Sequence, residues 1–137
     1  MRLLEQQLIQ LRGFRNAKIA DNVIGFQVPI RLTYYRGVWA SQLRAATVTV
    51  NNEVYANEQI FWTIDGNTIE QSELAITTDV HWNSMNAAIL TIRKEGGLAP
   101  GIYDVKVSYD FSSSYLPPAI DTGYFETKGE RKMVLVR

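Results

Sequence analysis

Residues 102–111, with the sequence IYDVKVSYDF, decide the fold of this chain. Large apolar side chains alternate with polar ones along the whole stretch. The apolar set is Tyr103, Val105, Val107, Tyr109 and Phe111, and the polar set is Asp104, Lys106, Ser108 and Asp110. Successive side chains of a β-strand point to opposite faces of its sheet, so a period of two is typical of a strand with one buried face. The stretch therefore predicts a strand that is buried on one side and solvated on the other.

The same alternation recurs on both sides of this stretch. The further apolar sets with a period of two lie within Val23 to Leu32, at Ala46, Val48 and Val50, at Ile60, Trp62 and Ile64, at Ala88, Leu90 and Ile92, and at Val134 and Val136. A weaker strand pattern covers Leu8 to Phe14, and Thr68 to Ala75 is the segment in which we expect a helical turn. Proline cannot donate to a sheet ladder, so Pro29 predicts an edge or a bulge within its strand.

Turn residues separate these strands. Asp65-Gly66 is a strong hairpin signal, Asn51-Asn52 follows Val50, and Gly96-Gly97 and Pro100-Gly101 precede the strand at Ile102. Short strands with such regular punctuation are typical of antiparallel sandwiches and barrels. We predict an all-β fold, an antiparallel two-sheet β-sandwich that forms a single domain over residues 1–137. The expected core includes Phe26, Val28, Ile30, Trp62, Leu90, Ile92, Val105 and Val107.

The composition argues against several classes of protein. The 137 residues contain no cysteine, which excludes disulfides and thiolate metal sites and fits a reducing compartment. Fourteen basic residues balance fourteen acidic ones, so no basic surface for nucleic acid is expected. No stretch approaches about 18 apolar residues, and Glu5 to Gln7 interrupt the apolar residues near the start, so neither a membrane span nor a signal peptide is expected. We expect a cytoplasmic protein that binds neither membranes nor nucleic acid.

Side chains suited to catalysis are sparse. His81 is the only histidine, no nucleophile motif surrounds it, and only carboxylates could join it around a metal. A glycosidase pair of carboxylates stays open because such pairing is spatial, although the acidic residues fall mostly in turns or on polar strand faces. We predict no catalytic, cofactor-binding or metal-binding residue in this chain, and a structural or surface role for His81.

Two segments leave the strand alternation and gather large side chains. The first runs from Thr33 to Ser41, and the second from Ser112 to Pro118. Tyr, Trp and Arg are enriched at the energetic centres of protein interfaces. We predict a partner interface that consists of Tyr34, Tyr35, Arg36, Gly37, Trp39, Tyr115, Leu116, Pro117 and Pro118. The alternative is that Trp39 and Tyr115 cap the ends of the sandwich core.

Several short motifs follow one another along nearly the whole chain. They are Gly13-Phe14-Arg15-Asn16, Gly25 to Leu32, Tyr34-Tyr35-Arg36-Gly37, Trp82-Asn83, Gly96-Gly97-Leu98 with Pro100-Gly101, and Tyr115-Leu116-Pro117-Pro118. Each motif is weak by itself, but in this order the set resembles the β subunit of C-glycoside deglycosidases. Two positions depart from the family pattern, Thr33 before Tyr34 and His81 before Trp82. Neither departure affects the expected fold or informs the chemistry.

The resemblance implies a heteromer in which this chain is the small, non-catalytic subunit. The larger α subunit is expected to be an isomerase-like (β/α)-barrel with a divalent metal, manganese, and to hold the catalytic groups. The implied substrates are 3-oxo-C-glycosides of plant aglycones such as flavonoids. A ketone at sugar C3 acidifies the proton at C2, a metal can stabilise the negative charge that develops, and the aryl carbon can then leave by elimination. The isolated chain is therefore expected to be inactive.

Two other functions stay open. The chain could be a stand-alone carbohydrate-binding sandwich, because its three Trp and seven Tyr residues would allow sugar stacking. It could also be an independent hydrolase that uses His81 and carboxylates. Neither alternative accounts for the ordered motifs, and binding of glycans or activity by the isolated chain would favour one or the other.

Overall fold

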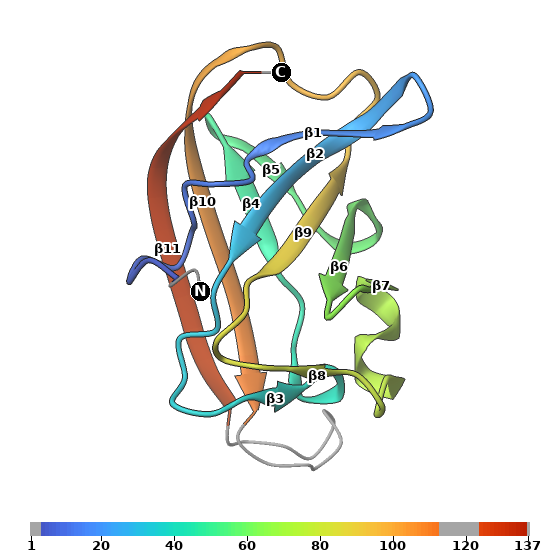
Figure 1. Cartoon of the computed structure of the whole chain (residues 1–137), viewed down its shortest axis with the longest axis vertical. Helices are drawn as coiled ribbons and strands as arrows, with labels where there is room; N and C mark the ends of the chain where they lie inside the picture. Colours follow the sequence, from blue (N-terminus) through green and yellow to red (C-terminus); the bar gives the residue numbers. More distant parts are fainter. Residues whose placement is uncertain (1–3, 113–123, 137) are drawn as a thin grey trace.

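The computed structural model describes residues 4–112 and 124–136 and confirms the predicted β-sandwich. One sheet has five strands in the order β1-β2-β9-β6-β7, and the other has four in the order β11-β10-β4-β5. All pairs within the sheets are antiparallel. Strands β3 and β8 form a two-stranded ribbon at one end of the sandwich (Figure 1). Among the described residues, no helix is long and apolar enough to cross a membrane.

The strands are short except for two near the end of the chain. They are β1 (Arg15–Ile19), β2 (Asn22–Ile30), β3 (Val38–Trp39), β4 (Thr47–Val50), β5 (Glu53–Tyr55), β6 (Ile60–Ile64), β7 (Asn67–Glu70), β8 (His81–Trp82), β9 (Ala88–Arg93), β10 (Gly101–Ser112) and β11 (Tyr124–Leu135). Three short 3₁₀ helices lie between them, η1 (Ala40–Gln42), η2 (Asn57–Gln59) and η3 (Gln71–Ile76).

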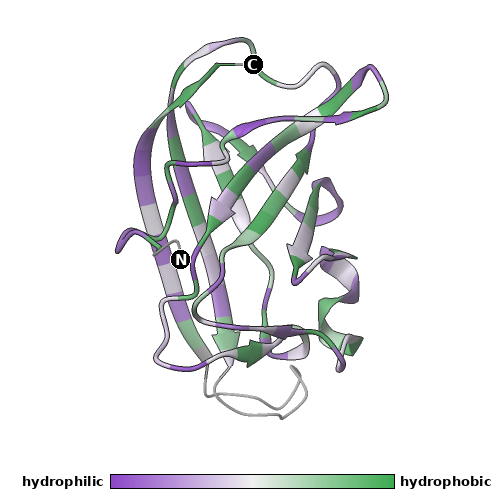
Figure 2. Cartoon of the chain, in the orientation of Figure 1, coloured by the Kyte–Doolittle hydropathy of each residue, from purple (hydrophilic) through white to green (hydrophobic). Residues whose placement is uncertain are grey.

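The core lies between the two sheets, where the predicted inward faces meet. All eight predicted core residues are buried, and Phe26, Val28 and Trp62 have no exposed surface. Polar and apolar residues alternate along β10 as expected (Figure 2). The rings of Trp62 and Tyr109 pack edge to face with their centroids 5.8 Å apart, and this contact joins the two sheets. The period of two therefore identifies the buried faces of the central strands correctly.

Two hairpins follow from the predicted turn residues. Asp65 and Gly66 both have positive φ and connect β6 directly to β7. Asn51 and Asn52 do the same between β4 and β5. Two positive φ angles in a two-residue loop define a type I′ turn, which Asn, Asp and Gly tolerate best and whose twist matches that of paired strands. The turn residues thus fix the register of both hairpins.

The predicted strand at Leu8 to Phe14 is wrong. This segment is bent and makes only a single bridge, between Ile9 and Ile30, although Leu8, Ile9 and Phe14 are buried. Two backbone hydrogen bonds flank this bridge, from Gln10 N–H to the Pro29 carbonyl and from Arg31 N–H to the Leu8 carbonyl, and the buried side-chain amide of Gln10 donates to the carbonyls of Glu5 and Gln7. The apolar residues of the segment close one open side of the sandwich.

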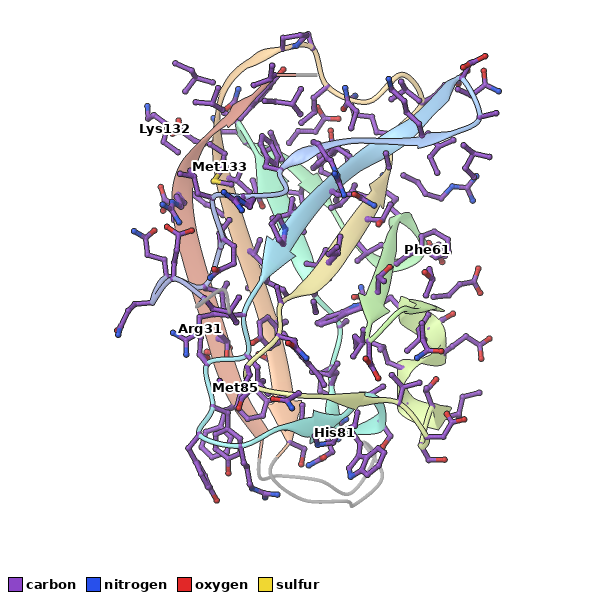
Figure 3. The ribbon with its side chains drawn as sticks, in the orientation of Figure 1. Arg31, Phe61, His81, Met85, Lys132 and Met133 are labelled. Atoms are coloured by element: carbon purple, nitrogen blue, oxygen red, sulfur yellow. The ribbon has the colours of Figure 1, made fainter. Side chains whose placement is uncertain are left out.

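The inward face predicted at the end of the chain is also wrong. Val134 and Val136 are exposed, whereas Met133 and Leu135 are buried. Met133 pairs with Tyr103 in β10, and Lys132 and Met133 lie on opposite faces of β11 (Figure 3). A β-branched residue also suits the solvated face of a sheet, so alternate valines do not by themselves identify the buried side.

Two smaller expectations need correction. The helical turn begins at Gln71, not Thr68, because Thr68 to Glu70 belong to β7. Pro29 lies in an internal strand of its sheet, but the pairing of β1 with β2 stops at Arg15 and Gln27. Beyond that point Pro29 is locally at an edge, where its carbonyl accepts a hydrogen bond from the Gln10 N–H (3.0 Å). Its missing N–H therefore breaks no bond between strands.

Candidate partner interface

The segment between β2 and β3 crosses the end of the sandwich where β10 ends and β11 begins (Figure 1). The Tyr109 hydroxyl fixes the start of this segment by donating to the Arg31 carbonyl (3.0 Å). Further along, the ring of Tyr34 lies 4.9 Å from that of Phe111 and 5.8 Å from that of Phe125. Phe111 and Phe125 face each other across β10 and β11. Tyr34 is therefore held against two rings that the sheet itself positions.

Aromatic surface is exposed beside this anchor. Tyr35 is 80% exposed, and its ring lies 4.6 Å from that of Tyr34. Phe125 is 47% exposed. The guanidinium carbon of Arg36 lies 5.6 Å from the Tyr34 ring centroid and 5.8 Å from that of Tyr35, which is within the range of cation–π attraction. We call Tyr34, Tyr35, Arg36 and Phe125 the aromatic end patch.

The pKa of the Tyr35 hydroxyl is affected by its neighbours in the patch. Hydrogen bonds with Tyr34 and Arg36, together with the positive charge of Arg36, lower the pKa of Tyr35. The opposite holds for Tyr109 below the patch, where burial raises the pKa of the phenol. The patch thus combines apolar rings, a cation and phenolic hydroxyls on one surface, which is the mixture of residue types that dominates binding at protein interfaces.

Trp39 lies on the β3–β8 ribbon at the same end of the molecule. It pairs with His81, and the two rings meet edge to face with their centroids 4.9 Å apart. Only glycine fits at position 37, because a Cβ there would clash with the His81 ring and the Trp82 carbonyl. The ribbon therefore presents Trp39 and His81 together, and Gly37 allows His81 to pack closely.

The sequence matches the family model described as C-glycoside deglycosidase beta subunit over residues 4–115. A relative from Eubacterium cellulosolvens, named C-glycoside deglycosidase beta subunit, is 41% identical over 121 residues. The match covers 88% of this chain and 82% of the relative. This chain belongs to the C-glycoside deglycosidase β-subunit family.

In this member of the β-subunit family, the structure brings together part of the predicted interface. Tyr34, Tyr35 and Arg36 form one surface with Phe125, and Gly37 and Trp39 continue the segment onto the ribbon. Tyr115, Leu116, Pro117 and Pro118 lie outside the described residues. Trp39 is half-buried, so a capping role and a contact role are both compatible with its position. The partner interface itself stays a prediction.

The interface predicted from the sequence does not include Phe125 or His81. Phe125 follows Tyr124 in an aromatic pair that resembles Tyr34-Tyr35, and this pairing was the available signal. His81 has no signal in the sequence, because its contact with Trp39 depends on the pairing of β3 with β8, two strands of only two residues each. Both residues are brought next to their contacts by the pairing of strands, which a short sequence motif does not show.

The described residues of this chain show no arrangement that is typical of a metal centre. In residues 4–112 and 124–136, no three His, Asp or Glu side chains gather where they could hold a metal ion. His81 is exposed, and the hollow beside it measures about 190 Å³, less than the roughly 300 Å³ of a small-molecule pocket. Asp65 and Asn83 line the same hollow. The described residues around this hollow therefore include no group of three such metal ligands.

Proposed function

We propose that this chain is the non-catalytic β subunit of a heteromeric C-glycoside deglycosidase and that the aromatic end patch, together with Trp39 on the β3–β8 ribbon, docks it to the α subunit. The observation that carries the proposal is the exposure of the patch. Tyr35 is 80% exposed in a chain whose other large aromatic side chains are mostly buried among the described residues. An exposed, pre-positioned aromatic residue beside an arginine is typical of an interface centre.

The geometry of the patch lowers the cost of docking. Tyr34 is already packed against Phe111, and Arg36 already lies over both tyrosine rings. Side chains that are ordered before binding lose little conformational entropy when a partner covers them. A stacked guanidinium can also donate to carboxylates or carbonyls through its edge. The partner surface that fits is therefore apolar, with an acceptor group opposite Arg36.

The chemistry in this proposal belongs to the α subunit. The α subunit is an isomerase-like barrel, and it cleaves the C–C glycosidic bond of 3-oxo-C-glycosides, such as those of flavonoids, by elimination. A divalent metal there, manganese, would stabilise negative charge that develops next to the C3 ketone. This chain contributes a rigid docking surface and no proton-transfer group. The single histidine, exposed and beside a small hollow, suits that division of roles.

The test measures binding of the full-length chain to the proposed α subunit. Tyr35→Ala and Trp39→Ala should each weaken association about thirtyfold, or roughly 2 kcal/mol, as truncation of an interface aromatic usually does. Circular dichroism establishes that each variant folds. Deglycosidase activity of the mixture should fall with binding and recover in part when the variant is in excess.

Ile19→Ala is the matched control. Ile19 is 65% exposed on the β1–β2 hairpin, at the opposite end of the molecule from the ribbon (Figure 1). Its truncation should leave binding unchanged. If Tyr35→Ala and Trp39→Ala fold and bind like wild type, these residues do not form the interface. If the wild-type chain ignores the α subunit and binds glycans alone, it is a carbohydrate-binding module instead.

A further inference from the structure

Strand β11 is the longest exposed sheet edge in the described part of the molecule. It has 12 residues and pairs only with β10, because it is the outermost strand of the four-stranded sheet. Long edge strands present unpaired N–H and C=O groups that can pair with another chain.

The register identifies the outward-facing backbone groups. On the β4 side of β10, the carbonyls of Asp104 and Asp110 accept hydrogen bonds from Asn51 and Arg44. The N–H and C=O groups of one strand residue point to the same side and alternate along the chain. Odd-numbered residues of β10 therefore bond to β11, where their partners are also odd-numbered. The even-numbered residues of β11 direct their backbone groups away from the sheet.

The side chains of these even-numbered residues carry an alternating charge. Along the outer face of β11 they are Glu126, Lys128, Glu130 and Lys132, all exposed, followed by Val134. When a strand pairs antiparallel with its own copy, this order is complementary in the register centred on Gly129. Glu126 then lies opposite Lys132 of the second copy, and Lys128 lies opposite Glu130. A slip of one pair in either direction places like charges opposite each other, for example Lys128 against Lys128.

The register favoured by the charges also pairs almost the whole of the strand. A centre at Gly129 pairs residues 124–134 of one copy with residues 134–124 of the other, almost the whole of β11. We propose that this edge binds a second copy of the chain, so that the two four-stranded sheets join through β11 into one continuous sheet. Direct opposite-charge pairs across strands stabilise a sheet, and like pairs destabilise it.

A like-charge pair within the chain supports the same register. Asp110 lies opposite Glu126 on the outer face, where the only charge complement from β11 in its neighbourhood is Lys128. In the proposed pairing, Lys132 of the second copy lies directly beside Glu126. The added strand thus supplies a positive charge at the position where one chain alone places two carboxylates side by side.

The N-terminal segment covers part of the inner face of β11 and leaves the outward-facing backbone groups of its edge unpaired among the described residues. Leu8 packs over Gly129, and Arg131 donates to the Ile9 carbonyl (2.9 Å) and to Glu5 (3.0 Å). The N-terminal segment therefore crosses β11 on the side that faces the core (Figure 1). No backbone hydrogen bond among the described residues reaches the outward-facing groups of β11. In the proposed dimer, the half-exposed Phe125 would lie opposite Met133 of the second copy on the inner face of the joined sheet.

The experiment is sedimentation velocity of the full-length chain over a series of concentrations, without the α subunit. The wild-type chain should form a dimer. Lys128→Glu and Glu130→Lys should each weaken it about tenfold or more, because the two-fold axis turns one reversal into two like-charge pairs. The double variant K128E/E130K should restore the wild-type affinity to within about threefold, because it exchanges the charges and keeps them complementary.

Two controls separate pairing from net charge and from unfolding. Glu58→Lys changes the net charge as Glu130→Lys does, but lies on η2, and it should leave the dimer intact. Thermal melting should show that every variant remains folded. A wild-type chain that stays monomeric at the highest concentration overturns the proposal, and the lysines and the N-terminal segment then protect the edge from pairing. Failure of the double variant to recover also overturns it, because the register would be wrong.

Discussion

Replacement of Gln71 by methionine should destabilise the fold strongly, although Gln71 is polar and lies in a short 3₁₀ helix. The side chain is buried, and its oxygen accepts hydrogen bonds from the Trp62 indole N–H and the Ala46 N–H, both at 2.8 Å. Its amide nitrogen donates to the Ala46 carbonyl at 3.0 Å. Trp62 belongs to the five-stranded sheet, and Ala46 precedes β4 of the other sheet. Gln71 therefore joins the two layers through polar contacts.

The magnitude follows from the groups that methionine would leave unpaired. The Trp62 indole N–H and the N–H and C=O of Ala46 lie on residues with no exposed surface. An unsatisfied buried donor or acceptor costs about 1–3 kcal/mol, and the apolar methionine offsets part of the loss. We expect the free energy of unfolding to fall by about 4 kcal/mol. For a chain of 137 residues this corresponds to a melting temperature about 14 °C lower.

The assay is urea and thermal unfolding of Gln71→Met, with Gln59→Met as the matched control. Gln59 is exposed and accepts one hydrogen bond, from Ala56 N–H at 3.2 Å, so its replacement should cost no more than about 0.5 kcal/mol. In a Trp62→Phe background, Gln71→Met should cost about 1–2 kcal/mol less, because the indole donor is gone. A loss below about 1 kcal/mol for Gln71→Met in the wild-type chain would refute the role assigned to this side chain.

Three further predictions test the core, the absence of catalysis and an electrostatic contact. Trp62→Ala should lower the free energy of unfolding by about 3–5 kcal/mol, measured by urea unfolding, and a loss under about 1 kcal/mol would contradict its burial. His81→Ala should leave deglycosidase activity of the complex within a few-fold of wild type, whereas loss of a true acid or base costs about 10²–10⁴. Burial and then the facing Glu126 raise the pKa of Asp110, so its charged form disfavours folding and the penalty disappears as the pH falls. Glu126→Gln should therefore raise the melting temperature of the monomeric chain slightly at pH 7 and not near pH 3, and an equal gain at both pH values would count against this explanation.

The sequence predicts the central strands because their periodicity and their turns agree. The run at 102–111 and the residues Asp65-Gly66 each specify a backbone geometry without help from distant contacts. The N-terminal segment shows where such reasoning fails. Leu8 and Ile9 are as apolar as strand residues, but the segment is bent, and its pairing with β2 is limited to one bridge, between Ile9 and Ile30. In this segment the apolar pattern predicts correctly that the side chains are buried, but it predicts wrongly that the backbone forms a strand.

The candidate interface is predicted in part for a similar reason. Composition identifies Tyr34, Tyr35 and Arg36, which are neighbours in sequence. Phe125 joins them only because β10 and β11 pair in one particular register, and His81 joins Trp39 only through the β3–β8 ribbon. Neither register is encoded in a short motif. Contacts that depend on pairing between distant segments therefore need the structure.

The position of β9 has a consequence for how the chain reaches its native state during synthesis. Residues 88–93 lie between β2 and β6, and β10 lies between β4 and β11. Up to residue 87, the chain can form the hairpins β1–β2, β4–β5 and β6–β7, each closed by a local turn. Contacts between distant segments form slowly, and unpaired strand edges are prone to aggregate. The five-stranded sheet becomes continuous only when residues 88–93 emerge, so a chain that stops earlier exposes the facing edges of β2 and β6 to its neighbours.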